Sequence, residues 1–151
     1  MFKIELHEQN SQPVLSIKTK TTMEQLPKII GENYKKIMDY LNELGEHPSD
    51  APFTAYHNLD MQALDVEMGF PVSKQLPGRG EIISGEIPAG KIVSAMYMGP
   101  YSGIEKTYEG IFKWISEEDL KPTGVYFEYY MNSPDEVPEN ELLTKIVIPV
   151  K

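Results

Sequence analysis

Glu128 is the residue whose surroundings most suggest chemistry, because it lies within the most aromatic stretch of the chain, VYFEYYMNSPDE (125–136). Side chains two residues apart in a strand share a face, which groups Glu128 with Tyr126 and Tyr130. The opposite group predicts a core face: Val125, Phe127, Tyr129 and Met131. A carboxylate between two phenols is typical either of a solvated strand face or of the floor of a ligand pocket.

A pocket is the favoured interpretation, since solvated strand faces more often carry Lys, Thr or Ser than tyrosine. A carboxylate partly desolvated among rings has a raised pKa and gains most from a cation or a hydrogen-bond donor on a ligand. The rings would add stacking and cation–π contacts. A protonated Glu128 would instead act as a general acid. The competing interpretation is a surface glutamate, or one paired across strands with a lysine.

Weaker candidates for the walls of such a pocket are three further aromatic residues. Tyr97 precedes the corner formed by Gly99 and Pro100, and its strand position groups it with Ala95 and Val93. Trp114, the only tryptophan, lies on the flank of a helical apolar stripe, where it is either core-edge packing or the wall of a cleft. Tyr56 lies near a strand end.

Nucleophilic and metal chemistry find little support. The chain has no cysteine, and His7, in a polar N-terminal strand, shares no ligand spacing with His47 or His57. The patterns of a nucleophile elbow, a phosphate loop and a zinc protease are missing from the sequence. We therefore expect neither a metal nor a cofactor.

The charge and hydropathy of the chain limit the kinds of partner that it can bind. With 14 basic and 23 acidic residues, the formal net charge is −9, which argues against direct binding of nucleic acid or of an anionic membrane. The N-terminus soon becomes polar, and no apolar run approaches the roughly 20 residues of a membrane span. We expect a soluble, cytoplasmic protein.

Two helices are expected. Apolar spacings of three and four predict the first over residues 23–44, with a capping box of Thr21 and Glu24 and a stop at Gly45. Since proline is best tolerated in a first turn, the regular helix is expected from about Leu26.

The second helix is predicted to begin at a capping box of Ser102 and Glu105 and to end near Glu118. Its apolar stripe consists of Ile104, Tyr108, Ile111 and Ile115.

Strands are predicted over 15–20, 52–58, 62–72, 80–87, 91–98, 125–131 and 141–150. The order strand, helix, strand, strand then occurs twice, and Tyr56-His57-Asn58 resembles Tyr130-Met131-Asn132. We therefore predict one domain, 1–151, with internal repeats of about 1–75 and 76–151. Each repeat alone is too small to bury much surface, so a shared core with a cleft between the halves is expected.

The motifs IPAGKIVSAMYMGPYSGIEKTYEGIFKWI (87–115) and KPTGVYFEYYMNSPDEVPENELLTKIVIPV (121–150) resemble the GyrI-like small-molecule-binding domain, also called the AraC-type effector-binding domain. The resemblance implies an α+β, SOUL-like fold: duplicated β-α-β-β units forming a pseudo-twofold antiparallel sheet with two helices and a central ligand cleft. It places the central acidic residue of that cleft at Glu128. It also implies a stand-alone member rather than an effector domain fused to a DNA-binding module.

Three functions follow from this resemblance. The first is binding of bulky, aromatic or cationic small molecules, as in multidrug binding, by Glu128 with Tyr126, Tyr130, Tyr97, Tyr56 and Trp114. The second is hydrolysis of cyclopropane-bearing DNA-alkylating compounds, with Glu128 activating water and Tyr130, or else Tyr97, as the phenol. The third is a gyrase-inhibitor-like protein contact.

Overall fold

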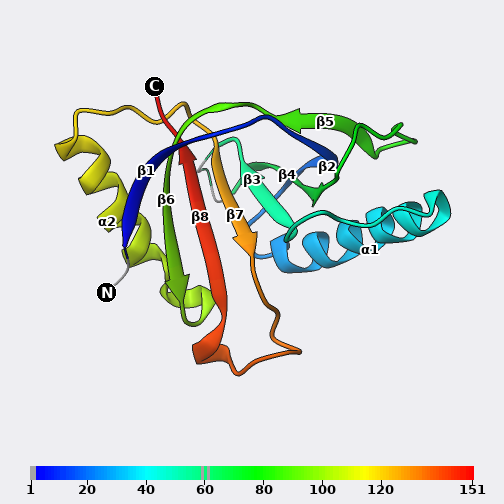
Figure 1. Cartoon of the computed structure of the whole chain (residues 1–151). Helices are drawn as coiled ribbons and strands as arrows, with labels where there is room; N and C mark the ends of the chain where they lie inside the picture. The colour runs from blue at the N-terminus through cyan, green and yellow to red at the C-terminus, as the bar shows by residue number, and fades with distance from the viewer. Residues whose placement is uncertain (1–2, 59, 61) are drawn as a thin grey trace. The chain divides into compact units, whose positions relative to one another are not determined.

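The computed structural model describes residues 3–58, 60 and 62–151, and Figure 1 shows the chain. Contacts divide it into two units. The first unit is Asn10–Ala89, and the second unit combines the N-terminal strand with Gly90–Lys151. Within the described residues the two units contain two α-helices and eight antiparallel strands, which confirms the predicted α+β class.

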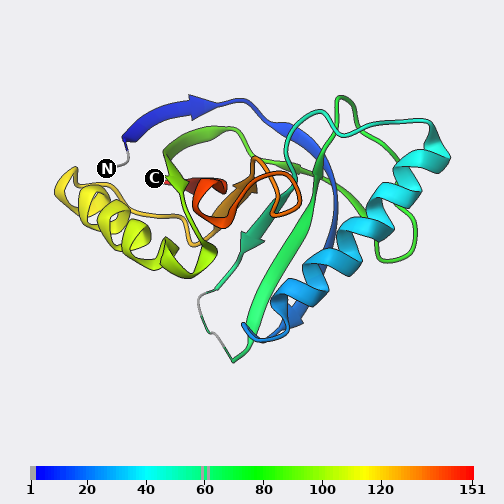
Figure 2. The ribbon, with the colours of Figure 1, turned by 90° about the horizontal axis from the view of Figure 1, so that it is seen from below.

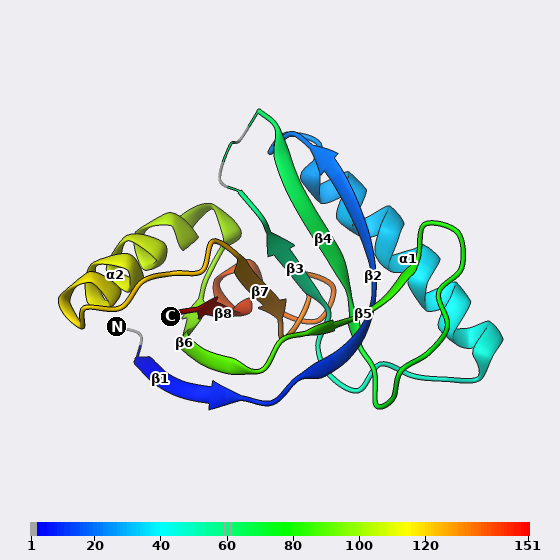
Figure 3. The same ribbon diagram turned by 90° about the horizontal axis from the view of Figure 1, so that it is seen from above.

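In the first unit, the strands lie in the order β3-β4-β2-β5. Their bounds are β2 Gln12–Thr21, β3 Phe53–Tyr56, β4 Leu64–Pro71 and β5 Ile83–Ile87, and α1 spans Leu26–Leu44. Figure 3 shows α1 running beside β2 and β4. The helix buries Ile37, Tyr40 and Leu41 against the apolar side chains of those strands. This burial of one apolar stripe is what stabilises the helix on the sheet.

In the second unit, the strands lie in the order β1-β6-β8-β7. Their bounds are β1 Ile4–Gln9, β6 Gly90–Met98, β7 Tyr126–Tyr130 and β8 Leu143–Pro149, with α2 at Ile104–Glu117 and short 3₁₀ turns at Tyr101–Gly103 and Glu139–Glu141. Figure 2 shows α2 beside β6. The predicted stripe of α2 is confirmed, since Ile111 and Ile115 are buried against Val93, Ile146 and Ile148.

The C-terminal ends of both helices and the start of α1 at Leu26 agree with the prediction, whereas the predicted capping boxes do not. Gly45 ends α1 with φ of 70°, and α2 ends at Glu117. Neither predicted capping box is formed. The first turn of α1 receives no side-chain cap, and Thr22, rather than Thr21, accepts a hydrogen bond from Gln25 N–H at 3.3 Å. The prediction for α2 was wrong because Ser102 lies in the preceding 3₁₀ turn, which makes Gly103 the N-cap.

The two units contain the same asparagine hydrogen bonds at corresponding places. Asn58 accepts from Asp65 N–H at 3.1 Å and donates to Ala63 O at 3.0 Å. In the second unit, Asn132 accepts from Leu143 N–H at 2.8 Å and donates to Glu141 O at 3.1 Å. Asn58 thereby closes the connection from β3 to β4, and Asn132 closes the connection from β7 to β8. The repeat bounds of about 1–75 and 76–151 stay a prediction.

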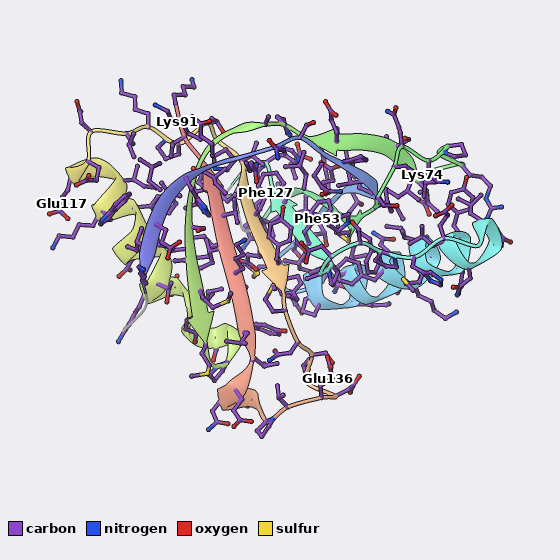
Figure 4. The ribbon with its side chains drawn as sticks, viewed as in Figure 1. Phe53, Lys74, Lys91, Glu117, Phe127 and Glu136 are labelled. Carbon is purple, nitrogen blue, oxygen red and sulfur yellow. The ribbon has the colours of Figure 1, made fainter. Side chains whose placement is uncertain are left out.

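The strand β7 also requires one correction. Phe127, labelled in Figure 4, is buried as predicted, but Met131 is 42% exposed. Tyr126, on the opposite face, packs against the cluster under α2, which consists of the buried residues Val93, Ala95, Ile111, Ile115, Ile146, Ile148 and Val150. The predicted core face is therefore not the only covered face of β7, because α2 covers the face that carries Glu128.

Candidate functional site

Glu128 lies in the middle of β7 and is 8% exposed. Strand pairing places it opposite Ile146, on the sheet face turned toward α2. Its Oε2 atom accepts a hydrogen bond of 2.5 Å from the Tyr108 hydroxyl on α2, and its Oε1 atom accepts one of 2.9 Å from the Tyr130 hydroxyl. Helix and strand together therefore fix both oxygens of a buried carboxylate.

Tyr101 lies beside this pair in the 3₁₀ turn before α2. Its ring meets that of Tyr130 edge-on, with centroids 5.8 Å apart, and 42% of its surface is exposed. Burial of its ring, together with the negative charge of Glu128, raises the pKa of the Tyr101 phenol above its usual range. We call Glu128, Tyr108, Tyr130 and Tyr101 the Glu128 cluster.

The other predicted aromatic residues have structural contacts. Tyr97 shares a face with Val93 and Ala95 as predicted, and its hydroxyl donates to Pro100 O at 2.6 Å. Tyr126 meets Phe112 edge-on at 5.5 Å. Trp114 is partly buried at the edge of the cluster under α2.

Tyr56 lies in the first unit, at the end of β3, and is 8% exposed. Of the six predicted site residues, the structure thus brings Tyr130 into contact with Glu128 through a hydrogen bond. Whether the others contact a ligand stays a prediction.

Two members of the Glu128 cluster, Tyr108 and Tyr101, were not among the predicted site residues. Tyr108 was predicted only as part of the apolar stripe of α2, although a buried tyrosine needs a partner for its hydroxyl. That need, next to a strand with a buried carboxylate, is the signal that identifies it. Tyr101 directly follows the corner of Gly99 and Pro100.

The first unit has a neutral side chain, Thr54, at the position where the second unit has the carboxylate of Glu128. Phe53 and Phe127, both labelled in Figure 4, hold the same place in their strands, opposite Gly69 and Val147. The next residues are then Thr54 and Glu128. The Tyr34 hydroxyl of α1 donates to Phe53 O at 2.8 Å and lies 3.3 Å from Thr54 Oγ1. The same helix–strand contact therefore exists in both units, with a charge in one of them.

The described part of the chain contains no group of three or more His, Asp or Glu side chains that could hold a metal ion. Within the same residues, no helix is long and apolar enough to cross a membrane.

The profile of the GyrI-like small-molecule-binding domain matches residues 2–151. The chain belongs to this family. As a GyrI-like domain it is a small-molecule-binding domain, which agrees with the resemblance drawn from its motifs. No curated protein sequence matches it significantly.

Solved structures show that the GyrI-like fold extends over the whole chain. EcmrR, in a complex with DNA, superposes with a TM-score of 0.87 and 23% identity over 99% of this chain, which spans 57% of EcmrR. SAV2435 bound to tetraphenylphosphonium superposes with a TM-score of 0.72 and 11% identity, over 99% of this chain and 94% of that one. A hydrolase from Listeria innocua gives 0.69 and 14%, over 99% and 92%.

Proposed function

We propose that the Glu128 cluster binds bulky aromatic or cationic small molecules, with Glu128 as the charged contact. The observation that carries the proposal is a carboxylate that is 8% exposed and whose two oxygens accept hydrogen bonds from the Tyr108 and Tyr130 hydroxyls. Phenols are neutral donors and leave the negative charge of the carboxylate in place. A cation that reaches it gains an interaction strengthened by its low-dielectric surroundings.

The rings of the cluster favour an aromatic ligand. Tyr101 exposes 42% of its surface and packs edge-on against Tyr130. Electron-rich ring faces attract cations, and ring edges pack against other rings. Tyr126, Tyr97 and Trp114 remain proposed as walls of the same site, and Tyr56 of the first unit remains proposed as a ligand contact.

A related structure supports this ligand class. SAV2435 shares the fold and has been solved with tetraphenylphosphonium bound. That cation carries four phenyl rings around one positive charge and has no hydrogen-bonding group, so it is a suitable probe of charge and ring contacts.

The test is calorimetric titration of the chain and of Glu128→Gln with tetraphenylphosphonium. We expect the variant to bind roughly ten- to a hundredfold more weakly, since it loses a charged partner of the cation. Glu117→Gln is the matched control, because it removes one carboxylate at the exposed end of α2 (Figure 4). A Glu128→Gln variant that binds as tightly as the parent would refute the charge role.

A second proposed function is hydrolysis of cyclopropane-bearing alkylating compounds. The observation that favours it is the contact of a carboxylate with two phenols. In such a group the carboxylate can accept a proton and a phenol can donate one. In this reaction Glu128 takes a proton from water as the water oxygen attacks a ring carbon. The carbon–carbon bond breaks, and its electron pair moves to the conjugated carbonyl oxygen, which Tyr130 or Tyr97 protonates.

Mass spectrometry of a cyclopropane-containing alkylator after incubation distinguishes the two functions. Hydrolysis adds the mass of one water, and Glu128→Gln should abolish that product. Recovery of unchanged compound, with binding intact, would leave binding as the function.

A further inference from the structure

Thr144 has the one buried side-chain oxygen in the described residues that lacks a hydrogen-bond partner. The residue lies in β8 and is fully buried. A buried hydroxyl without a partner loses its hydration and receives nothing in return, so most such groups in proteins are satisfied. This one therefore requires an explanation.

The sheet register places this hydroxyl next to the Glu128 cluster. Thr144 pairs with Tyr97 of β6 on one side and with Tyr130 of β7 on the other. Residues directly opposite one another in an antiparallel sheet share a face. The next row on that face contains Glu128, opposite Ile146. Thr144 thus adds a polar atom to the sheet face that carries the buried carboxylate.

The hydroxyl groups of the two flanking tyrosines donate their hydrogen bonds to other acceptors. Tyr97 donates to Pro100 O at 2.6 Å, and Tyr130 donates to Glu128 at 2.9 Å. Because a phenol has a single proton to donate, neither ring can donate to Thr144 while it keeps its present bond.

The first unit shows that the fold does not need this hydroxyl. The matched position there is Val66, which pairs with Thr19 of β2 and with Tyr56 of β3 and is fully buried. Valine has nearly the shape of threonine and carries a methyl group in place of the hydroxyl. The same sheet position thus accepts an apolar side chain in the unit that has Thr54 in place of a carboxylate.

We propose that Thr144 determines the ligand specificity of the Glu128 cluster, by hydrogen bonding to a hydroxyl or carbonyl group of the ligand. In the free protein one water molecule takes that position. This proposal rests on the proposed binding function. A ligand reaches Thr144 by displacing the ring of Tyr130, which packs against Tyr101 in the short turn Tyr101–Gly103.

Two cations that differ by one hydroxyl test the proposal. Tetraphenylphosphonium has no group that could bond to Thr144, whereas (4-hydroxyphenyl)triphenylphosphonium has one. We expect Thr144→Val to leave the affinity for the first within about twofold and to weaken the second roughly five- to tenfold, the value of one hydrogen bond. Equal effects on the two cations would overturn the proposal. Val66→Thr is the matched control and should leave the affinities for both cations unchanged.

Thermal unfolding and crystallography test Thr144 without a ligand. If its hydroxyl holds a water, Thr144→Val lowers the Tm, and a high-resolution crystal structure of the parent shows that water within hydrogen-bond distance of Oγ1. A dry Thr144, together with a higher Tm for Thr144→Val, would overturn the proposal. If the parent binds neither cation, the proposed binding of aromatic cations fails, and these two measurements still show whether the Thr144 hydroxyl holds a water. If the parent binds both cations and Thr144→Val weakens them equally, only the proposal for Thr144 fails.

Discussion

The hydroxyl of Tyr108 on α2 lies 2.5 Å from the Oε2 atom of Glu128 on β7. This bond joins the helix of the second unit to the strand that carries its buried charge. Its counterpart in the first unit joins Tyr34 to the main-chain carbonyl of Phe53 at 2.8 Å. The pair of bonds allows the value of a charged acceptor to be measured within one chain.

Tyr108→Phe should lower the free energy of unfolding by about 2–3 kcal/mol, since it removes a donor from a buried carboxylate. Tyr34→Phe should cost only about 1 kcal/mol, because its acceptor, the main-chain carbonyl of Phe53, is neutral. Chemical denaturation of both variants measures the difference. Equal losses would show that the charge of Glu128 adds nothing to the contact.

The titration of Tyr101 should report the charge of Glu128. Burial of Tyr101 and the nearby Glu128 carboxylate raise the pKa of its phenol. In Glu128→Gln the burial remains and the charge is lost, so this pKa should fall part of the way toward its usual value. NMR of ring-labelled tyrosine follows it. An unchanged Tyr101 titration would mean that burial alone sets its pKa.

Acid stability should depend on Glu67 in the first unit. Burial raises the pKa of this carboxyl. Hydrogen bonds from His57 and from Ser16, whose hydroxyl lies 2.5 Å away, lower the pKa, and the net pKa is below its usual value. A depressed pKa in the folded state contributes stability above the unfolded pKa of about 4.3, and this stability is lost as the pH falls through the folded pKa.

Ser16→Ala should therefore lower the free energy of unfolding at pH 7 by about 1–2 kcal/mol and move the loss of stability to a higher pH. Denaturation curves between pH 7 and pH 3 measure both effects. Ser94→Ala is the matched control from the second unit, since Ser94 lies 2.8 Å from His7 Nε2 and bonds to no carboxylate. Identical pH profiles for the two variants would contradict the role of Glu67.

Gly103→Ala should destabilise the corner before α2 by about 1–3 kcal/mol. A β-carbon at position 103 would lie 2.5 Å from the Tyr97 hydroxyl oxygen, which Pro100 O holds in place. Tyr97→Phe removes that oxygen, so the double variant should lose less stability than the sum of the two single ones. Additive losses in a double-mutant cycle would exclude the clash.

Periodicity in the sequence predicted much of the fold. The proline of α1 correctly indicated a regular helix from Leu26, and Gly45 correctly indicated its end. The similarity of the segments around Asn58 and Asn132 is explained by their matching hydrogen bonds. The capping box predicted for α2 was wrong, because a Ser-x-x-Glu pattern does not reveal whether its serine lies in a preceding 3₁₀ turn, as Ser102 does.

The site was harder to predict, because its contacts join elements that are distant along the chain. A period of two grouped Tyr130 with Glu128 within one strand. The bond from Tyr108 depends on how α2 packs against β7, and the orphan hydroxyl of Thr144 depends on strand register. Neither relationship is local, so no motif in a single sequence encodes it.

The position of β1 has a consequence for synthesis on the ribosome. Its strand partner is β6, so Ile4–Gln9 leaves the ribosome long before Gly90–Met98 exists. The intervening segment Asn10–Ala89 already contains the strand partners of β2, β4 and β5. The nascent chain can thus complete its first unit while the N-terminal strand still has an open edge, the kind of segment that pairs wrongly with other chains. The four charged or imidazole side chains of residues 3–8 (Lys3, Glu5, His7 and Glu8) help to keep that waiting strand in solution.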